Sequence, residues 1–398
     1  MSSETKIPPA AAFRRILSRA GPFIAEVDGL RFVAIMAVVL FHLAGYTTAK
    51  HMQDATVSPV EGWIPATLAQ GHYGVDLFFA LSGFLVTLPF ARWRLGLSER
   101  PSLRRFYLRR LTRLEPPYVI TIVLMFVGTL AVMGIRAGLA QLPHFLASLI
   151  YQHNLIYGSL YGVTWSLEIE AQFYVLAPLL TAVFAIRNTG WRRSVLIGAM
   201  LFVSLVRMLL PQSFALRFNS LPWHIEFFLA GFFLTDLYIV NWREAPKKLP
   251  RGDIYSLVGW ASFAVMAATN QLLFLMPLAT ILAYVGALTG RWSSWLLSRS
   301  ALVTIGGMCY SIYLLHYEVI SMTGRISTRF SPGSHFVIRF LVDAAVAIPA
   351  VMILSLLFFV AIERPCMNPG WPTAARNRFL KMLLPGKSTQ LAADESIA

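Results

Sequence analysis

The sequence predicts an all-α integral membrane protein with about ten transmembrane helices and both termini in the cytoplasm. Three observations predict this fold. First, of 398 residues 57% are hydrophobic and 13% are charged, whereas soluble domains carry about 25% charged residues. Second, the mean hydropathy is +0.61, and the apolar residues recur in long windows along the whole chain, so a cleaved signal peptide cannot account for them. Third, lysine and arginine are concentrated in alternate connecting loops.

Each apolar window is long enough to cross about 30 Å of hydrocarbon as a helix. The ten windows are 30–48, 74–91, 117–134, 165–186, 194–210, 222–240, 254–270, 271–289, 301–320 and 336–362. Only the polar step Asn270–Gln271 separates the seventh window from the eighth. The half-apolar stretch 142–157 contains Pro143 and two histidines, so we expect it to lie at the interface or to re-enter the membrane.

The basic residues orient these windows. With the N-terminus in the cytoplasm, the cytoplasmic loops hold 26 of the 34 lysines and arginines and the outer loops hold five, as the positive-inside rule predicts. The sequence pI of about 10.2 therefore reflects topology and lipid head groups, and no nucleic-acid partner is expected. The segment 92–113 contains eight arginines, which is more than topology requires.

We expect three regions: a cytoplasmic N-terminal segment at 1–29, a membrane domain at 30–362 and a cytoplasmic tail at 363–398. Basic and apolar residues at 11–23 and 377–387 suggest short interfacial segments. Pro365 is expected to end the last helix, with Glu363 and Arg364 at the head groups. The two cysteines, Cys309 and Cys366, lack a CxxC partner, so neither a disulfide framework nor a structural metal is expected.

The first window begins with Arg31 and carries His42 near its end. Eleven residues make three helical turns plus about 20°, so the two side chains share one face about 16 Å apart. Arg31 could simply be a snorkelling anchor, and His42 could be satisfied by a neighbouring helix. However, ionisable groups inside a membrane are more often functional.

Other ionisable residues also fall in the outer half of the predicted spans. They are Asp76, Glu168, Glu170, His224, Glu226, His316, Glu318, Arg339 and Asp343. Isolated in lipid each would cost about 2.5–3.5 kcal/mol, so they should face one another or a polar chamber that opens outward. His316 could equally be a chamber wall or a packed residue. Arginine suits phosphate groups on the cytoplasmic side, and histidine suits general base chemistry in the chamber.

Several motifs, in order and spacing, resemble the acyltransferase-3 family from Asp28 to Pro365. They are DGLRFVAIMAVVLFH at 28–42, GVDLFFALSGFLVT at 74–87, FYLRRLTRLEPPY at 106–118, WSLEIEAQFYVLAPLL at 165–180, CYSIYLLH at 309–316 and IERP at 362–365. The resemblance implies a multi-pass membrane enzyme that acylates glycans, lipids or secreted small molecules.

The resemblance implies catalytic roles for three residues. His42 would be the base that takes the proton of an acceptor hydroxyl. Glu170, with Asp76, could orient or polarise this histidine. The family often has a second glutamate where this chain has Ala171, and Glu168 stands where a small residue is common, so either Glu168 or Glu170 could act.

The resemblance also implies a site for the donor, acyl-CoA and most simply acetyl-CoA, as a substrate with no tightly bound cofactor and no metal. Arg31, Arg110 and Arg113 would hold it from the cytoplasmic side. Tyr310 and Ser311 could line its tunnel or serve ordinary helix packing.

The sequence therefore predicts a membrane O-acetyltransferase that moves an acyl group to a hydroxyl of a glycan, glycolipid or glycosylated small molecule. We expect it in the bacterial cytoplasmic membrane, as a stand-alone form without the SGNH hydrolase-like domain that some family members carry. The alternative is a transporter that uses the same carboxylates and histidines as a relay, although no pair of related halves is visible.

Overall fold

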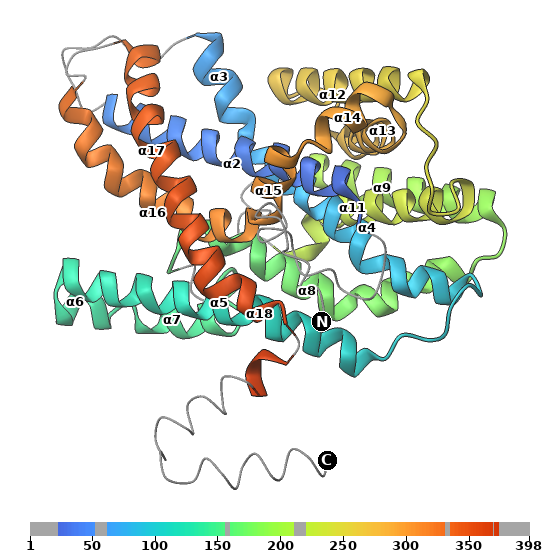
Figure 1. Ribbon diagram of the computed structural model, residues 1–398, viewed down its shortest axis with the longest axis horizontal. Coiled ribbons are helices and arrows are strands. Elements are labelled where there is room, and N and C mark those ends of the chain that lie inside the picture. The colour runs from blue at the N-terminus through green and yellow to red at the C-terminus, as the bar shows by residue number, and fades with distance from the viewer. Residues whose placement is uncertain are drawn as a thin grey trace, which may run out of the picture.

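A computed structural model describes residues 23–51, 62–155, 160–210, 220–330, 335–368 and 370–373. All regular secondary structure in these residues is helical, which confirms the all-α prediction (Figure 1). The predicted interfacial segments lie outside the described residues, apart from Phe23 at the end of the first.

The α-helices are α2 (Ala25–His51), α3 (Trp63–Ala69), α4 (Gly74–Arg94), α5 (Leu103–Met133), α6 (Ile135–Leu139), α7 (Leu142–Leu149), α8 (Trp165–Leu180), α9 (Thr189–Leu209), α11 (Ile225–Asp236), α12 (Pro250–Thr269), α13 (Met276–Thr289), α14 (Arg291–Leu297), α15 (Ser300–Gly307), α16 (Cys309–Ser327), α17 (Phe336–Phe358) and α18 (Arg364–Cys366). Short 3-10 or π segments are η1 (Gln70–Tyr73), η2 (Gly162–Thr164), η3 (Thr181–Ala185), η4 (Leu221–Trp223), η5 (Leu237–Asn241), η6 (Leu273–Leu275), η7 (Thr328–Phe330) and η8 (Phe359–Glu363).

All ten predicted windows fall on helices, but their number as membrane spans is not confirmed. Among the described residues, five helical stretches are long and apolar enough to cross a membrane, or six if a pair bent by 86° at Gly290 counts as one span. The five are Ala25–Lys50, Trp63–Arg94, Leu103–Met133, Gly162–Ala185 and Phe336–Cys366. The other windows fall either on helices that are long enough but less apolar or more charged, namely α9 and α12 with 21 and 20 residues, or on shorter or interrupted helices, such as α11 with its 12 residues.

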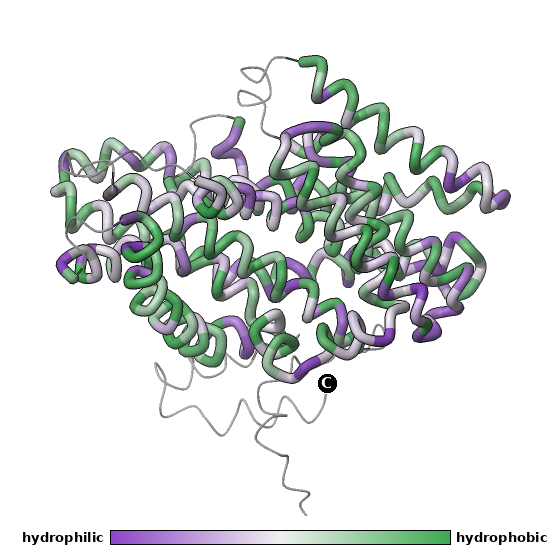
Figure 2. The backbone as a smooth tube through the Cα atoms, turned by 90° about the horizontal axis from the view of Figure 1, so that it is seen from above, coloured by the Kyte–Doolittle hydropathy of each residue, from purple (hydrophilic) through white to green (hydrophobic). Residues whose placement is uncertain are grey.

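Two of these stretches turn apolar side chains outward. Only 22% of the apolar window in α5 and 28% of that in the stretch containing α17 are buried. Figure 2 shows hydrophobic residues along most of the length of the helices. In water such large exposed apolar faces would favour aggregation, whereas in a bilayer they match the lipid chains, so these helices have the surface expected of a membrane protein.

Helix α2 runs through the middle of the fold and contacts α4, α15, α16 and α17 (Figure 1). Its apolar residues Leu30, Ile35 and Val38 are buried in the main core. The contact with α15 is especially close, because a Cβ on Gly306 would lie 1.8 Å from the carbonyl oxygen of Asp28. Any larger residue at position 306 would therefore push these two helices apart.

The window 301–320, predicted as one span, is divided at Met308 into α15 and α16. The consecutive residues Gly306 and Gly307 lower helix propensity by about 1 kcal/mol each, and Gly306 is held by its contact with α2. The break lets α16 take its own direction and lie against both α2 and α17.

The arginine-rich segment between the second and third predicted windows is helical in its second half. From Leu103 the arginine-rich segment is already helical, and α5 continues through Pro116 and Pro117 to Met133. Proline has no backbone N–H, so Pro116 leaves the carbonyl oxygen of Thr112 without its helical donor. The indole Nε1–H of Trp371 donates to that oxygen at 2.7 Å.

Replacing Trp371 with phenylalanine is expected to destabilise the protein by about 1 kcal/mol, because the carbonyl of Thr112 then loses its donor. The measurement is the unfolding temperature in detergent micelles, which should fall. The matched control is Trp292→Phe, since the ring of Trp292 is 73% exposed. An equal effect of the two substitutions would contradict this account of how α5 tolerates Pro116.

The last helix ends at Cys366, beside Pro365 as predicted, but the side chain of Glu363 faces the protein interior and not the surface. Its side chain is fully buried. It accepts hydrogen bonds from the backbone N–H of Ser311 at 3.1 Å and from the Ser311 hydroxyl at 2.6 Å. A buried carboxylate needs such donors, so this contact fixes the end of α17 and η8 against the beginning of α16.

Candidate functional site

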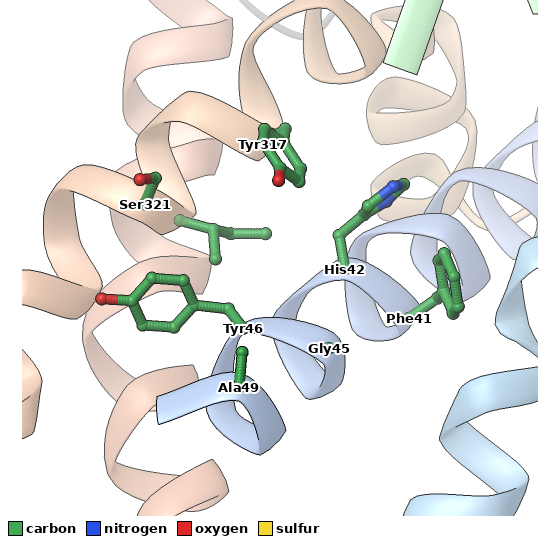
Figure 3. A pocket seen from close by; sticks show the side chains of 8 residues that line it. Phe41, His42, Gly45, Tyr46, Ala49, Tyr317 and Ser321 are labelled. Carbon is green, nitrogen blue, oxygen red and sulfur yellow. The ribbon is translucent and has the colours of Figure 1, made fainter. Parts of the chain in front are cut away.

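A cavity of about 240 Å³ lies between α2 and α16. Figure 3 shows Tyr317 and Ser321 of α16 facing His42 and Tyr46 of α2. The lining residues of α2 recur at helical spacing, so one face of the helix forms the wall. They are Phe41, His42, Gly45, Tyr46 and Ala49, and those of α16 are Tyr317, Ile320 and Ser321. Ligand pockets usually measure about 300–1,000 Å³, so this cavity is somewhat smaller than most of them.

His42 is held by contacts to one of its two ring nitrogens. Its Nδ1 lies 3.0 Å from the carbonyl oxygen of Val38 and 3.1 Å from Nε2 of His316. The ring also makes an edge contact with Tyr317, with ring centres 5.4 Å apart. These contacts leave Nε2 of His42 as the nitrogen that can act on a group in the cavity.

Arg31 lies on the same unbroken helix, 11 residues before His42, which places it about 16 Å along the axis. Its guanidinium forms an ion pair with Asp28 at 2.5 Å. It also lies within electrostatic range of Tyr174 of α8. A single continuous stretch of α2 therefore begins with Arg31 and ends with His42.

Arg110 of α5 reaches the same tyrosine. Its guanidinium carbon lies 5.0 Å from the ring centre of Tyr174 and 3.8 Å from that of Phe106. We call Arg31, Arg110, Arg113 and Tyr174 the arginine cluster, since Tyr174 lies within electrostatic range of all three arginines. The predicted donor residues Arg31, Arg110 and Arg113 therefore all interact electrostatically with one tyrosine, although they come from α2 and α5, and their role toward a donor stays a prediction.

Arg113 has a buried Nε without a hydrogen-bond partner among the described residues. Among the residues that the structure describes, neither Arg110 nor Arg113 forms an ion pair with a carboxylate. Both residues are half-buried, and a guanidinium group that is partly removed from water without an anionic partner is destabilising. An anionic ligand at the arginine cluster would remove this cost.

Glu170 also contacts this cluster. It accepts a hydrogen bond from the Ser82 hydroxyl at 2.5 Å and another from the Tyr174 hydroxyl, and it lies within electrostatic range of Arg110. The sequence suggested that Glu170 orients His42, but in the structure His316 is the side chain that hydrogen-bonds to His42. Glu168 accepts instead from the backbone N–H of Asn154 at 2.8 Å.

Asp76, the other predicted partner of His42, has a different neighbour. Its Oδ1 lies 3.5 Å from Nδ1 of His224. Beside His224 on α11, Glu226 forms an ion pair at 2.7 Å with Arg207 of α9. Neighbouring ends of α4, α9 and α11 thus share a charged cluster, and none of the contacts given above for this cluster involves His42.

The two predicted tunnel residues lie at the start of α16. Tyr310 donates its hydroxyl proton to the carbonyl oxygen of Leu114 at 2.9 Å, close to Pro116 in α5. Ser311 is fully buried and donates to Glu363. Both therefore make definite contacts between helices, and their role toward a donor stays a prediction.

His316 is the residue whose importance the sequence left undecided. It is fully buried and lies 274 positions from its partner His42. The sequence did place both histidines in the outer half of their spans, and this common depth was the signal that could have paired them.

Comparison with protein families gives one match. A model described as an acyltransferase domain, that of the acyltransferase-3 family, covers residues 24–364. The matched region includes His42, the arginine cluster and His316. No solved structure matches the chain.

Two relatives are similar over most of this chain. It is 26% identical to the protein named peptidoglycan O-acetyltransferase OatA of Listeria monocytogenes, over 88% of this chain and 56% of that protein. It is 25% identical to the O-acetyltransferase OatA of Staphylococcus aureus, over 96% of this chain and 62% of that protein. The chain thus spans about 60% of the length of these relatives.

Proposed function

The chain belongs to the acyltransferase-3 family, and from this membership we propose that it is a membrane O-acetyltransferase of bacterial cell-surface glycans. Acetyl-CoA is the donor on the cytoplasmic side, and a sugar hydroxyl is the acceptor on the outer side. The names of the two relatives support acetyl transfer, and the name of the Listeria protein supports a glycan acceptor.

The observation that carries this proposal is the placement of Arg31 and His42 on one helix. Arg31 belongs to the arginine cluster, and His42 lines the cavity between α2 and α16. Arginine forks bind phosphate groups well, so the cluster suits the phosphates of the donor. The acyl arm then extends about 16 Å toward His42.

At the cavity, Nε2 of His42 acts as the general base. It takes the proton of the acceptor hydroxyl while the hydroxyl oxygen attacks the thioester carbonyl carbon. The carbon–sulfur bond breaks, the ester forms, and the leaving thiolate takes up the proton that His42 accepted, which gives free CoA and neutral His42. A positioned histidine base is worth about 10²–10⁴ in rate.

In this proposal the protein spans the cytoplasmic membrane about ten times with both termini inside. The distribution of lysine and arginine supports this orientation. It places Arg104, Arg110 and Arg113, at the beginning of α5, on the cytoplasmic side, where the donor is available. It places the outer cavity beside the acceptor.

The purified protein in lipid vesicles tests the proposal with labelled acetyl-CoA and a soluble peptidoglycan fragment. The expected result is loss of the thioester, dependent on the acceptor, with the label recovered as an O-acetyl ester. Passage of the fragment across the vesicle membrane without loss of thioester would instead support a transporter.

Substituting leucine for Gly45 is expected to lower kcat/KM for the acceptor about tenfold or more. A Cβ at this position meets no atom within 4 Å, and Gly45 lines the cavity. The added Cβ therefore needs no shift of the backbone, and the rest of the leucine side chain extends into space that the acceptor needs under the proposed function. The measurement is kcat/KM for acceptor and donor separately.

The matched control is Gly45→Ala, which adds one methyl group and improves helix propensity by up to about 1 kcal/mol. It should keep acceptor turnover within about twofold of the original. If Gly45→Leu also retained its acceptor kcat/KM, the acceptor would bind elsewhere.

A further inference from the structure

We propose that His316 is a positioning residue that fixes the tautomer of His42, so that Nε2 of His42 always carries the lone pair needed for proton removal. The inference rests on the proposed function for its kinetic consequence, but the tautomer itself follows from hydrogen bonds. It concerns a residue on α16, outside the helix that carries the base.

Two carbonyl groups determine which ring nitrogen of His316 carries the proton. Nδ1 of His316 lies 2.8 Å from the carbonyl oxygen of Tyr313 and 3.1 Å from that of Ile312. Carbonyl oxygens only accept hydrogen bonds, so Nδ1 must carry a proton. In the neutral ring, Nε2 of His316 is then an acceptor.

This acceptor determines the state of His42. Nε2 of His316 lies 3.1 Å from Nδ1 of His42, and a hydrogen bond between two ring nitrogens needs one proton. Because His316 supplies none from Nε2, Nδ1 of His42 must be the donor. The carbonyl oxygen of Val38, 3.0 Å from the same nitrogen, requires a proton there as well.

The opposite arrangement is unfavourable. A proton on Nε2 of His316 would make that ring a cation, and the ring is fully buried with no carboxylate within ion-pair distance among the described residues. It would also turn a lone pair of His42 toward the carbonyl of Val38. Both contacts therefore favour a neutral pair in which Nδ1 of His42 is protonated.

The consequence is that neutral His42 presents an unprotonated Nε2. Without His316, the ring of His42 can adopt the other tautomer or rotate about its side-chain bonds. In a fraction of the molecules Nε2 is then protonated or misplaced and cannot act as the base. In serine proteases a carboxylate has the corresponding role for a catalytic histidine, and loss of the correct tautomer there lowers kcat about 10⁴-fold. A neutral partner such as His316 should contribute less.

The test compares His316→Asn with His316→Gln. The asparagine amide can still donate to the carbonyls of Ile312 and Tyr313, but it is too short to reach His42. The glutamine carbonyl can reach approximately the position of Nε2 and accept from His42. We expect His316→Asn to lower kcat about 30-fold with little change in KM for acetyl-CoA, and His316→Gln to restore kcat to within about fivefold.

Equal loss in both variants, with unfolding temperatures unchanged, would overturn the positioning role. A loss confined to KM for the donor would overturn it too. If either variant failed to fold, the tautomer in the unmodified protein would still decide the question.

That tautomer is read by solid-state ¹⁵N NMR of histidine-labelled protein in lipid bilayers, with His42→Gln used to assign the signals of His42. The expected result is a protonated Nδ1 and an unprotonated Nε2, and the reverse tautomer would overturn the inference. This readout needs no turnover. If no acetyl transfer were found while the expected tautomer was observed, the proposed function would fail and the inference would stand.

Discussion

Replacing His42 with glutamine is expected to lower kcat for acetyl transfer about 10²–10⁴-fold, the usual contribution of a general base. Glutamine keeps a polar side chain of similar reach but cannot take a proton near neutral pH. KM for acetyl-CoA should change little, because the arginine cluster that holds the donor is about three turns away on α2. The measurement is steady-state acetyl transfer by purified protein in vesicles.

The control for this substitution is His335→Gln, since His335 is exposed just before α17 and does not cap the helix with its side chain. It should retain the full rate. The unfolding temperature of His42→Gln should match that of the unmodified protein. Retained turnover in folded His42→Gln would reject His42 as the base.

The double substitution Arg110→Ala and Arg113→Ala is expected to raise KM for acetyl-CoA about 100-fold or more. Hydrogen bonds to charged groups are worth about 1.5–3 kcal/mol each, and both guanidinium groups lie in the arginine cluster without a carboxylate partner among the described residues. At saturating donor, kcat should fall much less, because the cavity is unchanged. Initial rates over a range of acetyl-CoA concentrations measure both quantities.

The same helix supplies a matched control for charge. Arg104 and Arg105 are exposed in the first turn of α5, and their double replacement with alanine removes the same net charge. KM for acetyl-CoA should then stay within about threefold. An equal rise in both double variants would show that general charge near the membrane, and not the arginine cluster, attracts the donor.

Hydropathy located the helices well, because the cost of leaving backbone groups unpaired in lipid forces apolar segments to be helical. It could not locate their ends where a distant residue intervenes. Helix α5 runs through Pro116 because Trp371 supplies a donor that the local sequence lacks. The window 301–320 divides at Met308, just after two consecutive glycines, of which Gly306 meets the backbone of α2.

The candidate site was predictable to the extent that it lies on one helix. The spacing of Arg31 and His42 fixes their common face by geometry alone. The neighbours of His42 come from other helices, and helical periodicity gives no distance between two faces. Glu170 and His316 were thus both placed at a suitable depth, yet only His316 is in contact with His42.

The continuity of α2 also bears on which donors can react. The helix has no proline or other interruption between Ala25 and His51, so no hinge can adjust the interval between the phosphate anchor and the base. A thioester on a shorter arm would stop below the imidazole, and one on a longer arm would pass it. Under the proposed function, the fixed length of α2 therefore selects acyl donors by the length of their arm. No additional recognition element is needed for this selection.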